Sequence, residues 1–235
     1  LKQRFGLPRQ SLLVPELLSE IIIFPEFQPE LSLQGLSEFS HLWILWFFHG
    51  NPKYQFHGKV RPPRLSGQSI GLFATRSPFR PNPIAMSVVK LLHCDLNRGL
   101  LLISGGDMMD GTPVLDVKPY LREVDAVADA VSGWCERASR PHITVEWSPQ
   151  AAAQLYQWPG TPISQEEFKH LVTKLVALDP RPVAHRQRRV RRHVITIYDW
   201  NCIFCFKNPS LAQIVALCPP GNDMTKVVAY EHGEA

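Results

Sequence analysis

Short apolar runs fill the first 145 or so residues of the chain, and glycine, proline and asparagine separate them. No long amphipathic helical pattern lies between these runs, so a doubly wound parallel sheet is not expected. A mixed or antiparallel barrel fits the pattern better. The segment from Asp95 to Gly99 separates two of the runs and is expected to turn a hairpin. The runs that we predict to be strands are LWILWFF, IGLFAT, IAMSVVKLLHC, LLLIS and HITVEW.

The residue pattern changes near Ser148, and the pattern from there on predicts a small α+β unit. Ser148 and Pro149, followed by AAAQLYQW, are typical of an N-cap, a first-turn proline and a short helix. In the next helical stretch, ISQEEFKHLVTKLVALDP, Ser164 and Glu167 have the spacing of a capping box. Three later runs, VITIYDW, CIFCF and QIVALC, predict a small sheet. The apolar spacing of the second helix predicts one buried face, made of Phe168, Leu171, Val172, Leu175 and Val176.

The change in pattern predicts two domains: a mainly β barrel over residues 1–145 and a small α+β domain over residues 146–235. The hydrophobic fraction of 45% and charged fraction of 20% are typical of soluble globular proteins. A formal net charge of +4 is compatible with a nucleic-acid partner without indicating one. Between Arg181 and His193 there are six arginines, two histidines and no acidic residue. Such blocks are usually solvated loops, and binding to an RNA backbone is the main functional alternative.

Several function classes find no support in the sequence. There is no P-loop, no GxGxxG after a strand and no GxSxG elbow. The nine histidines lack metal-ligand spacing and the five cysteines are scattered, so we expect neither a metal site nor a disulfide framework. Cys202 and Cys205 form a lone CxxC, for which core packing is favoured over zinc. No secretory signal or membrane-spanning run is visible, so we expect a cytoplasmic protein with no membrane partner.

The segment GLFATRSPFRPNPIAMS places Arg76 and Arg80 in a loop that prolines make stiff. Proline fixes its own φ and pushes the preceding residue towards extended conformations, so Arg80 and Asn82 do not suit a helix. A rigid cationic loop can bind an anion without a large ordering cost. A solvated proline-rich turn is the alternative interpretation of this segment.

A second polar segment, GGDMMDGTPVLDVKPY, gathers three carboxylates around Gly111. They are Asp107, Asp110 and Asp116. Glycine and proline beside carboxylates usually form a turn, and they also let backbone groups approach a ligand closely. For each aspartate alone, a turn or capping role and a functional role remain open.

The order of five motifs resembles that of one known family. FGLPRQ, FSHLWILWFFH, VRPPR, GLFATRSPFRPNPIAMS and DGTPVLDVKPY follow one another from Phe5 to about Asp129. In this order and spacing they closely resemble the tRNA methyltransferase O family, also called the TsaA-like or YaeB-like family. DPRP at Asp179 to Pro182 and YDWN at Tyr198 to Asn201 extend the resemblance to the bacterial members.

The resemblance implies a β-barrel methyltransferase that uses S-adenosylmethionine without a Rossmann fold and forms a homodimer. Members methylate the exocyclic nitrogen of threonylcarbamoyl-adenosine beside the anticodon of threonine tRNA. In the family a strand normally precedes the PRQ motif, which is Pro8 to Gln10 here. The sequence lacks that strand, so an exposed barrel edge is expected. The cofactor contacts carried over from the family are Pro8, Arg9, Gln10, His49, Gly50, Arg76, Met86, Asp110, Gly111 and Thr112. The tRNA contacts that we expect are Arg80, Arg181, Arg186, Arg188, Arg189, Tyr198 and Asn201.

A direct displacement, with sulfur, methyl and acceptor nitrogen in line, is consistent with these residues. Catalysis would then rest mainly on positioning. The acceptor nitrogen carries an acyl-type substituent, so its proton must leave. Asp110 or Asp116 would accept it or hold the cofactor, and the sequence does not choose between those roles. Arg76 and Arg80 would engage phosphate or the threonine carboxylate, since planar guanidinium groups bind such anions in a bidentate manner.

Three other interpretations remain open at this point. One is a non-catalytic RNA-binding module of the same fold, which would not bind S-adenosylmethionine. Another is a methyltransferase of the same fold acting on a small molecule or on another RNA. The third is a structural interaction protein whose apolar strands bind a partner. The motif order favours the tRNA enzyme over all three.

Overall fold

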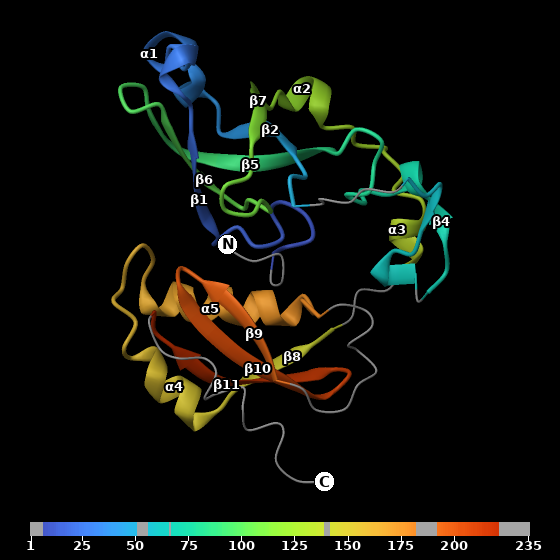
Figure 1. Cartoon of the computed structure of the whole chain (residues 1–235), viewed down its shortest axis with the longest axis vertical. Coiled ribbons are helices and arrows are strands. Elements are labelled where there is room, and N and C mark those ends of the chain that lie inside the picture. Colours follow the sequence, from blue (N-terminus) through green and yellow to red (C-terminus); the bar gives the residue numbers. More distant parts are fainter. Residues whose placement is uncertain (1–6, 51–55, 66, 139–141, 182–191, 221–235) are drawn as a thin grey trace. The chain divides into compact units, whose positions relative to one another are not determined.

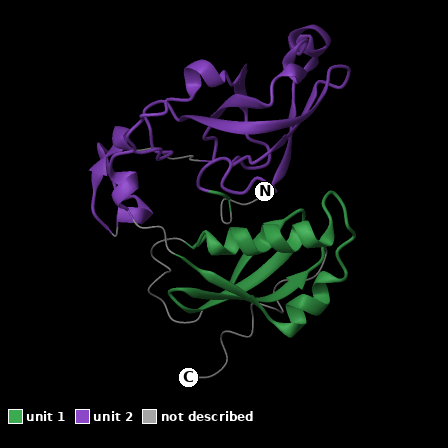
Figure 2. Ribbon diagram, turned by 180° about the vertical axis from the view of Figure 1, so that it is seen from behind, with its two compact units in different colours: residues 1–8, 141–235 green, residues 9–140 purple. Residues whose placement is uncertain are grey.

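The computed structural model describes residues 7–50, 56–65, 67–138, 142–181 and 192–220. The chain forms two compact units, one of residues 9–140 and one of residues 1–8 together with 141–235 (Figure 2). Arg186, Arg188 and Arg189 lie outside the described residues, so their tRNA contacts stay predictions.

An antiparallel five-stranded sheet forms the centre of the N-terminal unit, as the apolar runs predict (Figure 1). In the part of the chain that the structure describes, no ladder joins the two outer strands, β1 and β7. The closure of this sheet into a barrel therefore stays a prediction. In spatial order, the strands are β1 (Leu18–Ile22), β6 (Leu100–Ser104), β5 (Ile84–Asp95), β2 (His41–Phe47) and β7 (Val114–Pro119).

Strand β2 carries the hydrophobic core of this sheet. Its buried residues Leu42, Ile44 and Trp46 alternate with the half-buried Trp43 and Leu45. Because side chains on a strand point alternately to opposite faces, the first three share the core face. The other buried members of this core are Ile21, Leu33, Val89, Leu101 and Ile103.

A tight hairpin between β5 and β6 confirms the turn predicted from Asp95 to Gly99. Asp95 Oδ1 accepts a hydrogen bond from the backbone N–H of Arg98 at 3.0 Å. Gly99 adopts a φ of +61°, and a Cβ at this position would lie 2.5 Å from the carbonyl oxygen of Ile23. Both the conformation and the close approach therefore require glycine here.

Short helices connect the strands of the N-terminal unit. The indole nitrogen of Trp43, on β2, donates to Asp125 Oδ2 at 3.0 Å and so links the sheet to the helix after β7. The connecting elements are η1 (Pro25–Phe27), α1 (Pro29–Ser32) and η2 (Leu36–Glu38) before β2, and α2 (Arg122–Asp125) after β7.

The prediction of a strand over IGLFAT was wrong for most of its length. Only β4 (Ile70–Gly71) forms, paired with β3 (Lys59–Val60), and the chain then enters the 3-10 turn η4 (Leu72–Ala74). Thr75 closes this turn, because its hydroxyl and its backbone N–H both donate to the carbonyl oxygen of Leu72, at 2.7 and 3.1 Å. Threonine favours local hydrogen bonds of this kind over continued strand pairing.

Arg64, from the VRPPR motif, has a structural role. It lies in η3 (Pro63–Leu65), and its Nη2 donates to the carbonyl oxygens of Cys135 and Ala138, both at 2.7 Å. These carbonyls belong to or follow α3 (Trp134–Arg137), so the arginine ties η3 to this helix. The other arginine of the motif, Arg61, is exposed.

Within its described residues, the C-terminal unit combines two helices with a four-stranded sheet, which confirms the predicted α+β pattern (Figure 1). Strand β8 runs parallel to β11, and the other pairs are antiparallel. The sequence groups the predicted strand HITVEW with the runs of the first domain. In the structure this segment contains β8, which belongs to the sheet of the C-terminal unit. Its pairing with a strand so distant in the chain leaves no local signal in the sequence. In spatial order, the strands are β8 (Thr144–Trp147), β11 (Leu211–Cys218), β10 (Trp200–Asn208) and β9 (Arg192–Ile197).

Both predicted helix starts are confirmed. Ser148 Oγ accepts from the backbone N–H of Ala151 at the start of α4 (Pro149–Leu155). Ser164 and Glu167 form both bonds of a capping box at the start of α5 (Gln165–Ala177). None of the helices in the described ranges has the length and apolar character needed to cross a bilayer. The buried residues of α5 are the five predicted ones, Phe168, Leu171, Val172, Leu175 and Val176.

Candidate functional site

A hydrogen bond joins two of the predicted cofactor residues. Arg76 Nη1 donates to Gln10 Oε1 at 2.6 Å, although the residues are 66 positions apart in the sequence. Gln10 Nε2 in turn donates to the carbonyl oxygen of Arg9 at 2.6 Å. The PRQ segment and the stiff cationic loop therefore meet at one place in the N-terminal unit.

Backbone hydrogen bonds hold the chain after the PRQ segment against the end of β6. The N–H of Leu12 donates to the carbonyl oxygen of Gly105 at 2.8 Å, and the N–H of Gly105 donates to Leu17 at 3.0 Å. Gly105 has a φ of +78°, and a Cβ here would lie 2.8 Å from Leu12 Cδ2. A glycine at this position thus allows the PRQ side of the site to pack closely on the GGD segment.

Asp107 accepts hydrogen bonds that connect three parts of the site. Its Oδ1 accepts from Ser87 Oγ at 2.6 Å, and Ser87 Oγ accepts from Trp46 Nε1 at 2.9 Å. An indole N–H can only donate, so Ser87 Oγ accepts from Trp46. An ionised carboxylate can only accept, so the hydroxyl proton of Ser87 serves the bond to Asp107. The carboxylate also accepts from the backbone N–H of Ser11, next to the PRQ segment.

The environment of Asp107 perturbs its titration. Burial raises the pKa of this carboxyl group above its usual value, although the bonds from Ser87 and Ser11 and the charge of Arg76 act in the opposite direction. The sequence leaves Asp107 open between a turn role and a functional role, and the predicted site does not include it. A signal was available in Ser87, a serine on the core face of a strand, where a polar group needs a partner.

The turn Asp110 to Thr112 has the conformation that a glycine permits. Gly111 adopts a φ of +72°, and the N–H of Thr112 donates to the carbonyl oxygen of Met109 at 3.2 Å. Asp110 is exposed. Thr112 Oγ1 is buried and has no hydrogen-bond partner within the described residues. A buried hydroxyl without a partner is costly, so this atom is suited to bind a ligand.

Asp116 differs from Asp107 in its surroundings. It lies exposed on β7, and Lys118 Nζ is 2.8 Å from its Oδ2. The hydrogen bond from Lys118 lowers the pKa of Asp116 below its usual value. A carboxylate with a lowered pKa is a weaker base, and the two roles predicted for Asp116, proton acceptor or cofactor contact, stay predictions.

The remaining predicted cofactor residues lie near the ends of β2 and β5 or within the PRQ segment. Met86 is exposed on β5, where it pairs with Leu45 of β2. His49 is exposed and Gly50 is partly buried just after β2. Pro8 is buried and Arg9 is exposed. Their contacts with a cofactor stay predictions.

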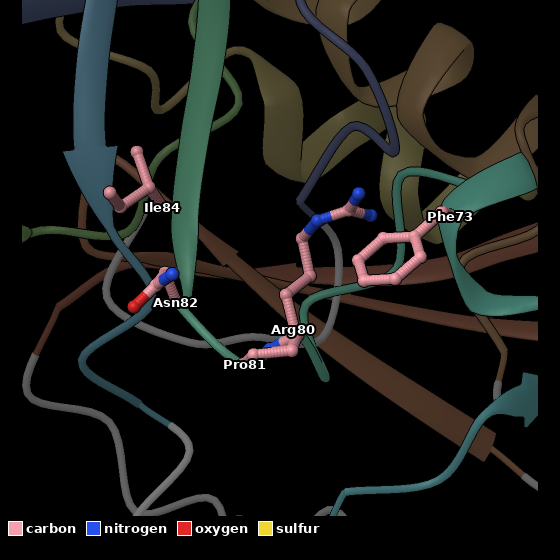
Figure 3. Close-up of a pocket in the computed structure, with 5 residues that line it drawn as sticks. All are labelled: Phe73, Arg80, Pro81, Asn82 and Ile84. Atoms are coloured by element: carbon pink, nitrogen blue, oxygen red, sulfur yellow. The ribbon is translucent and has the colours of Figure 1, made fainter.

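Arg80 forms a second, separate group with Phe73. Its Nη1 donates to the carbonyl oxygen of Thr75 at 2.8 Å, and its Cζ lies 5.4 Å from the centre of the Phe73 ring. Figure 3 shows the Arg80 side chain beside this ring, with Asn82 and Ile84 on the other side of the pocket. The open pocket has a volume of about 400 Å³ and is lined by Phe73, Arg80, Pro81, Asn82 and Ile84.

Arg181, a predicted tRNA contact, is buried in the C-terminal unit. Its side chain is only 7% exposed, its Nε lies 2.7 Å from Asp179 Oδ1, and its Cζ lies 3.3 Å from the centre of the Phe206 ring. A guanidinium group in this position stabilises the unit and has little surface to offer a phosphate. The structure therefore argues against this contact, because the carboxylate two residues earlier and the aromatic ring hold the cation inside.

The YDWN motif forms the turn between β9 and β10. Tyr198 and Asp199 have φ values of 48° and 66°, which are typical of a two-residue hairpin turn of type I′. Tyr198 is partly buried, with its ring 6.2 Å from that of Trp158. Asn201 Oδ1 accepts from Thr196 Oγ1 at 2.8 Å across the hairpin. These contacts give both residues structural roles, and their tRNA contacts stay predictions.

Comparisons with known proteins agree with the predicted family over both halves of the chain. Residues 1–126 match the family model for the tRNA-methyltransferase O N-terminal domain, and residues 140–219 match that for the TrmO C-terminal domain.

Curated relatives and a solved structure match nearly the whole chain. A Pseudomonas aeruginosa protein, RcsF, provisionally named an S-adenosylmethionine-dependent methyltransferase, is 40% identical over 91% of this chain and 90% of its own length. The tRNA (adenine(37)-N6)-methyltransferase of Escherichia coli K12 is 33% identical over 85% of this chain and 86% of its own. The crystal structure of TrmO from Pseudomonas aeruginosa superposes with a TM-score of 0.74 at 33% identity, covering 93% and 92% of the two chains. The chain therefore belongs to the tRNA-methyltransferase O family.

Proposed function

We propose that this chain is a cytoplasmic, S-adenosylmethionine-dependent tRNA (adenine-N6)-methyltransferase that acts on threonylcarbamoyl-adenosine beside the anticodon of threonine tRNA. The names of the bacterial relatives support the cofactor and the methylation of adenine 37 in tRNA. The motif resemblance supports the finer substrate, the barrel and a homodimer. The observation that carries the proposal is the bond between Arg76 and Gln10, which brings the two most specific family motifs together.

The residues present fit S-adenosylmethionine. Arg76 carries five N–H donors, and the bond to Gln10 uses one of them, so its planar edge can also bind the carboxylate of the cofactor. The buried hydroxyl of Thr112 provides a polar group that gains a partner when a ligand binds. We propose that these two residues, with Arg9 and Gln10, hold the cofactor. When bound, S-adenosylmethionine supplies a methyl group on a sulfonium centre whose leaving group is a neutral thioether.

The protein contributes mainly by positioning, and its parts are fixed before the substrates arrive. Asp107 holds the backbone at Ser11, and Gly105 holds Leu12, so the neighbouring Gln10 presents its amide to Arg76 from a fixed segment. Orientation of this kind can supply effective molarities of about 10⁵ M or more. Rigid donors also avoid an ordering cost when an anion binds.

A proton must leave the acceptor nitrogen during the transfer, and Asp110 is the better of the two predicted acceptors. Asp116 is ion-paired with Lys118, whereas Asp110 lies exposed in the turn that leads to Thr112. We expect Asp110→Asn to lower kcat at least about tenfold, in line with the loss of a general base. Asp116→Asn should change kcat by less than about threefold, and the opposite ranking would exchange the two roles.

Transfer of label from S-adenosylmethionine to tRNA tests the proposal directly. Bulk tRNA is assayed in two forms, isolated from cells with and without the threonylcarbamoyl modification. Incorporation that depends on the modification supports the full proposal, and equal incorporation removes the finer substrate while leaving the methyltransferase. Calorimetry with S-adenosylmethionine separates the alternative of a non-catalytic RNA-binding module, which would give no heat of binding and no transfer.

A further inference from the structure

Phe73 is an unusual aromatic residue, because it is exposed and yet held in place. Its side chain is 71% exposed, while its neighbour Leu72 is 1% exposed in the interior. On the other side, Trp134 Nε1 donates to the carbonyl oxygen of Ala74 at 2.8 Å. Thr75 closes the turn by donating its hydroxyl to Leu72. Hydrogen bonds therefore hold the backbone on both sides of Phe73, and they fix the position from which its ring projects.

The cationic wall of the pocket is anchored in the same way. Arg80 donates to the carbonyl oxygen of Thr75 at 2.8 Å, and the N–H of Ser77 donates to Thr75 Oγ1 at 3.2 Å. Thr75 thus links the turn that carries Phe73 to the loop that carries Arg80. Both groups face an open pocket of about 400 Å³ that also has the amide of Asn82 and the aliphatic side chain of Ile84 (Figure 3).

The charges around Phe73 distinguish it from Phe27, another exposed aromatic residue of the same unit. Phe27 is 60% exposed, but Glu26 precedes it and Glu30 follows it closely in the chain. Phosphate groups would be repelled there, whereas Phe73 lies beside a guanidinium group. An aromatic face next to an arginine, with an amide for hydrogen bonding, is the combination that binds unstacked bases of single-stranded RNA.

We propose that this pocket binds one unpaired nucleobase of the RNA substrate, stacked on the Phe73 ring, with Arg80 beside the base or its phosphate. The inference rests on the proposed function, since it takes the substrate to be a tRNA whose anticodon loop carries the methylated adenosine. Arg76, which we propose as a cofactor contact, lies only four residues before Arg80 in the chain. We therefore place the stacked base in the same anticodon loop of the RNA as the target adenosine. The pocket positions the loop by sequence-tolerant stacking, because every base has a π-face.

Fluorescence of 2-aminopurine tests the stacking. Anticodon stem–loop RNAs, each with 2-aminopurine at a single loop position, are titrated with the full chain. We expect quenching at one position with the wild-type protein, loss of that quenching with Phe73→Ala, and retention with Phe73→Trp. Phe27→Ala is the matched control, and it should quench as the wild type does. Equal quenching by wild type and Phe73→Ala at every position overturns the proposal, and so does an equal loss in Phe27→Ala.

Kinetics provide a second readout that a merely structural role would not produce. Phe73→Ala should raise KM for tRNA about tenfold, as removal of one base–aromatic stack does, while calorimetric affinity for S-adenosylmethionine stays unchanged. A fall in cofactor affinity together with a lower melting temperature would instead assign Phe73 to the fold and overturn the proposal. Absence of methyl transfer by the wild-type protein would refute the proposed function, whereas the fluorescence experiment would still decide whether an RNA base stacks on Phe73.

Discussion

Ser87 Oγ lies 2.6 Å from Asp107 Oδ1, and this bond links the middle strand β5 to the loop that follows β6. Trp46 donates to the same hydroxyl from β2. Three segments of the N-terminal unit thus meet at one carboxylate, which also accepts from Ser11 beside the PRQ segment. Hydrogen bonds to the Asp107 carboxylate therefore connect the sheet to the segment that carries the predicted cofactor residues.

Removal of this carboxylate should destabilise the protein. Asp107→Ala leaves the hydroxyl of Ser87 and the N–H of Ser11 without their acceptor. We expect a loss of about 1–3 kcal/mol in the free energy of unfolding, the usual penalty for donors left unsatisfied in the interior. Urea denaturation at about pH 4, where the carboxyl group makes its full contribution, measures this loss. Asp110→Ala, at an exposed position, is the control and should stay within about 0.5 kcal/mol of wild type. A smaller effect for Asp107→Ala than for this control would contradict the role of Asp107.

The stability that Asp107 provides should depend on pH in a defined direction. Its pKa is raised in the folded state, so the folded protein binds this proton more tightly than the unfolded chain does. The stabilising contribution is thus fully present below the usual carboxyl pKa of about 4, and it is lost as the pH rises through the raised value. Urea titrations of wild type and Asp107→Ala from pH 4 to pH 8 should show a difference that shrinks with pH. A difference that grows with pH would refute this assignment.

Substitution of Arg76 should abolish methyl transfer without unfolding the protein. The guanidinium group is exposed and bonds to Gln10, so its loss removes an anion-binding group and leaves no buried group unsatisfied. Both Arg76→Ala and Arg76→Lys should lower kcat/KM at least about 100-fold, because lysine cannot reproduce bidentate binding. The melting temperature should not change. Arg98→Ala, in the exposed β5–β6 turn, serves as the control, and wild-type transfer by Arg76→Ala would remove Arg76 from the site.

Arg181 should prove to be a stability residue and not an RNA contact. Arg181→Ala removes the cation that lies 2.7 Å from the buried carboxylate of Asp179, and loss of one member of a buried ion pair typically costs about 3–5 kcal/mol. A large fall in melting temperature is therefore expected. Lys207→Ala breaks a surface ion pair with Glu146 and should cost less than about 1 kcal/mol. An Arg181→Ala protein with unchanged melting temperature and weakened tRNA binding would restore the original prediction.

Local patterns predicted the elements whose causes are local. The α5 helix follows from its capping box and its apolar stripe, and the β5–β6 hairpin from Asp95 and Gly99. The failures have non-local or competing causes. IGLFAT was predicted to extend because its residues favour strands, but the hydroxyl of Thr75 closes a turn instead. Strand β8 pairs with a segment near the other end of its unit, which no local window contains.

The same contrast applies to the site. The motif resemblance predicts that Arg76 and Gln10 belong to one site, and a hydrogen bond joins them in the structure. The sequence did not indicate the buried position of Asp107, because one carboxylate in a glycine-rich turn gives no sign of burial. The sequence did not indicate the burial of Arg181, because a block of like charges does not reveal that Asp179 and Phe206 enclose one member.

The parallel pairing of β8 with β11 has a consequence for biosynthesis. Among the described residues, β8 is the first strand of the C-terminal sheet in sequence order and β11 is the last, and the two are neighbours in that sheet. Contacts between distant segments form slowly, since loop closure must precede them. A nascent polypeptide emerging from the ribosome can therefore complete this sheet only after Leu211–Cys218 has left the exit tunnel.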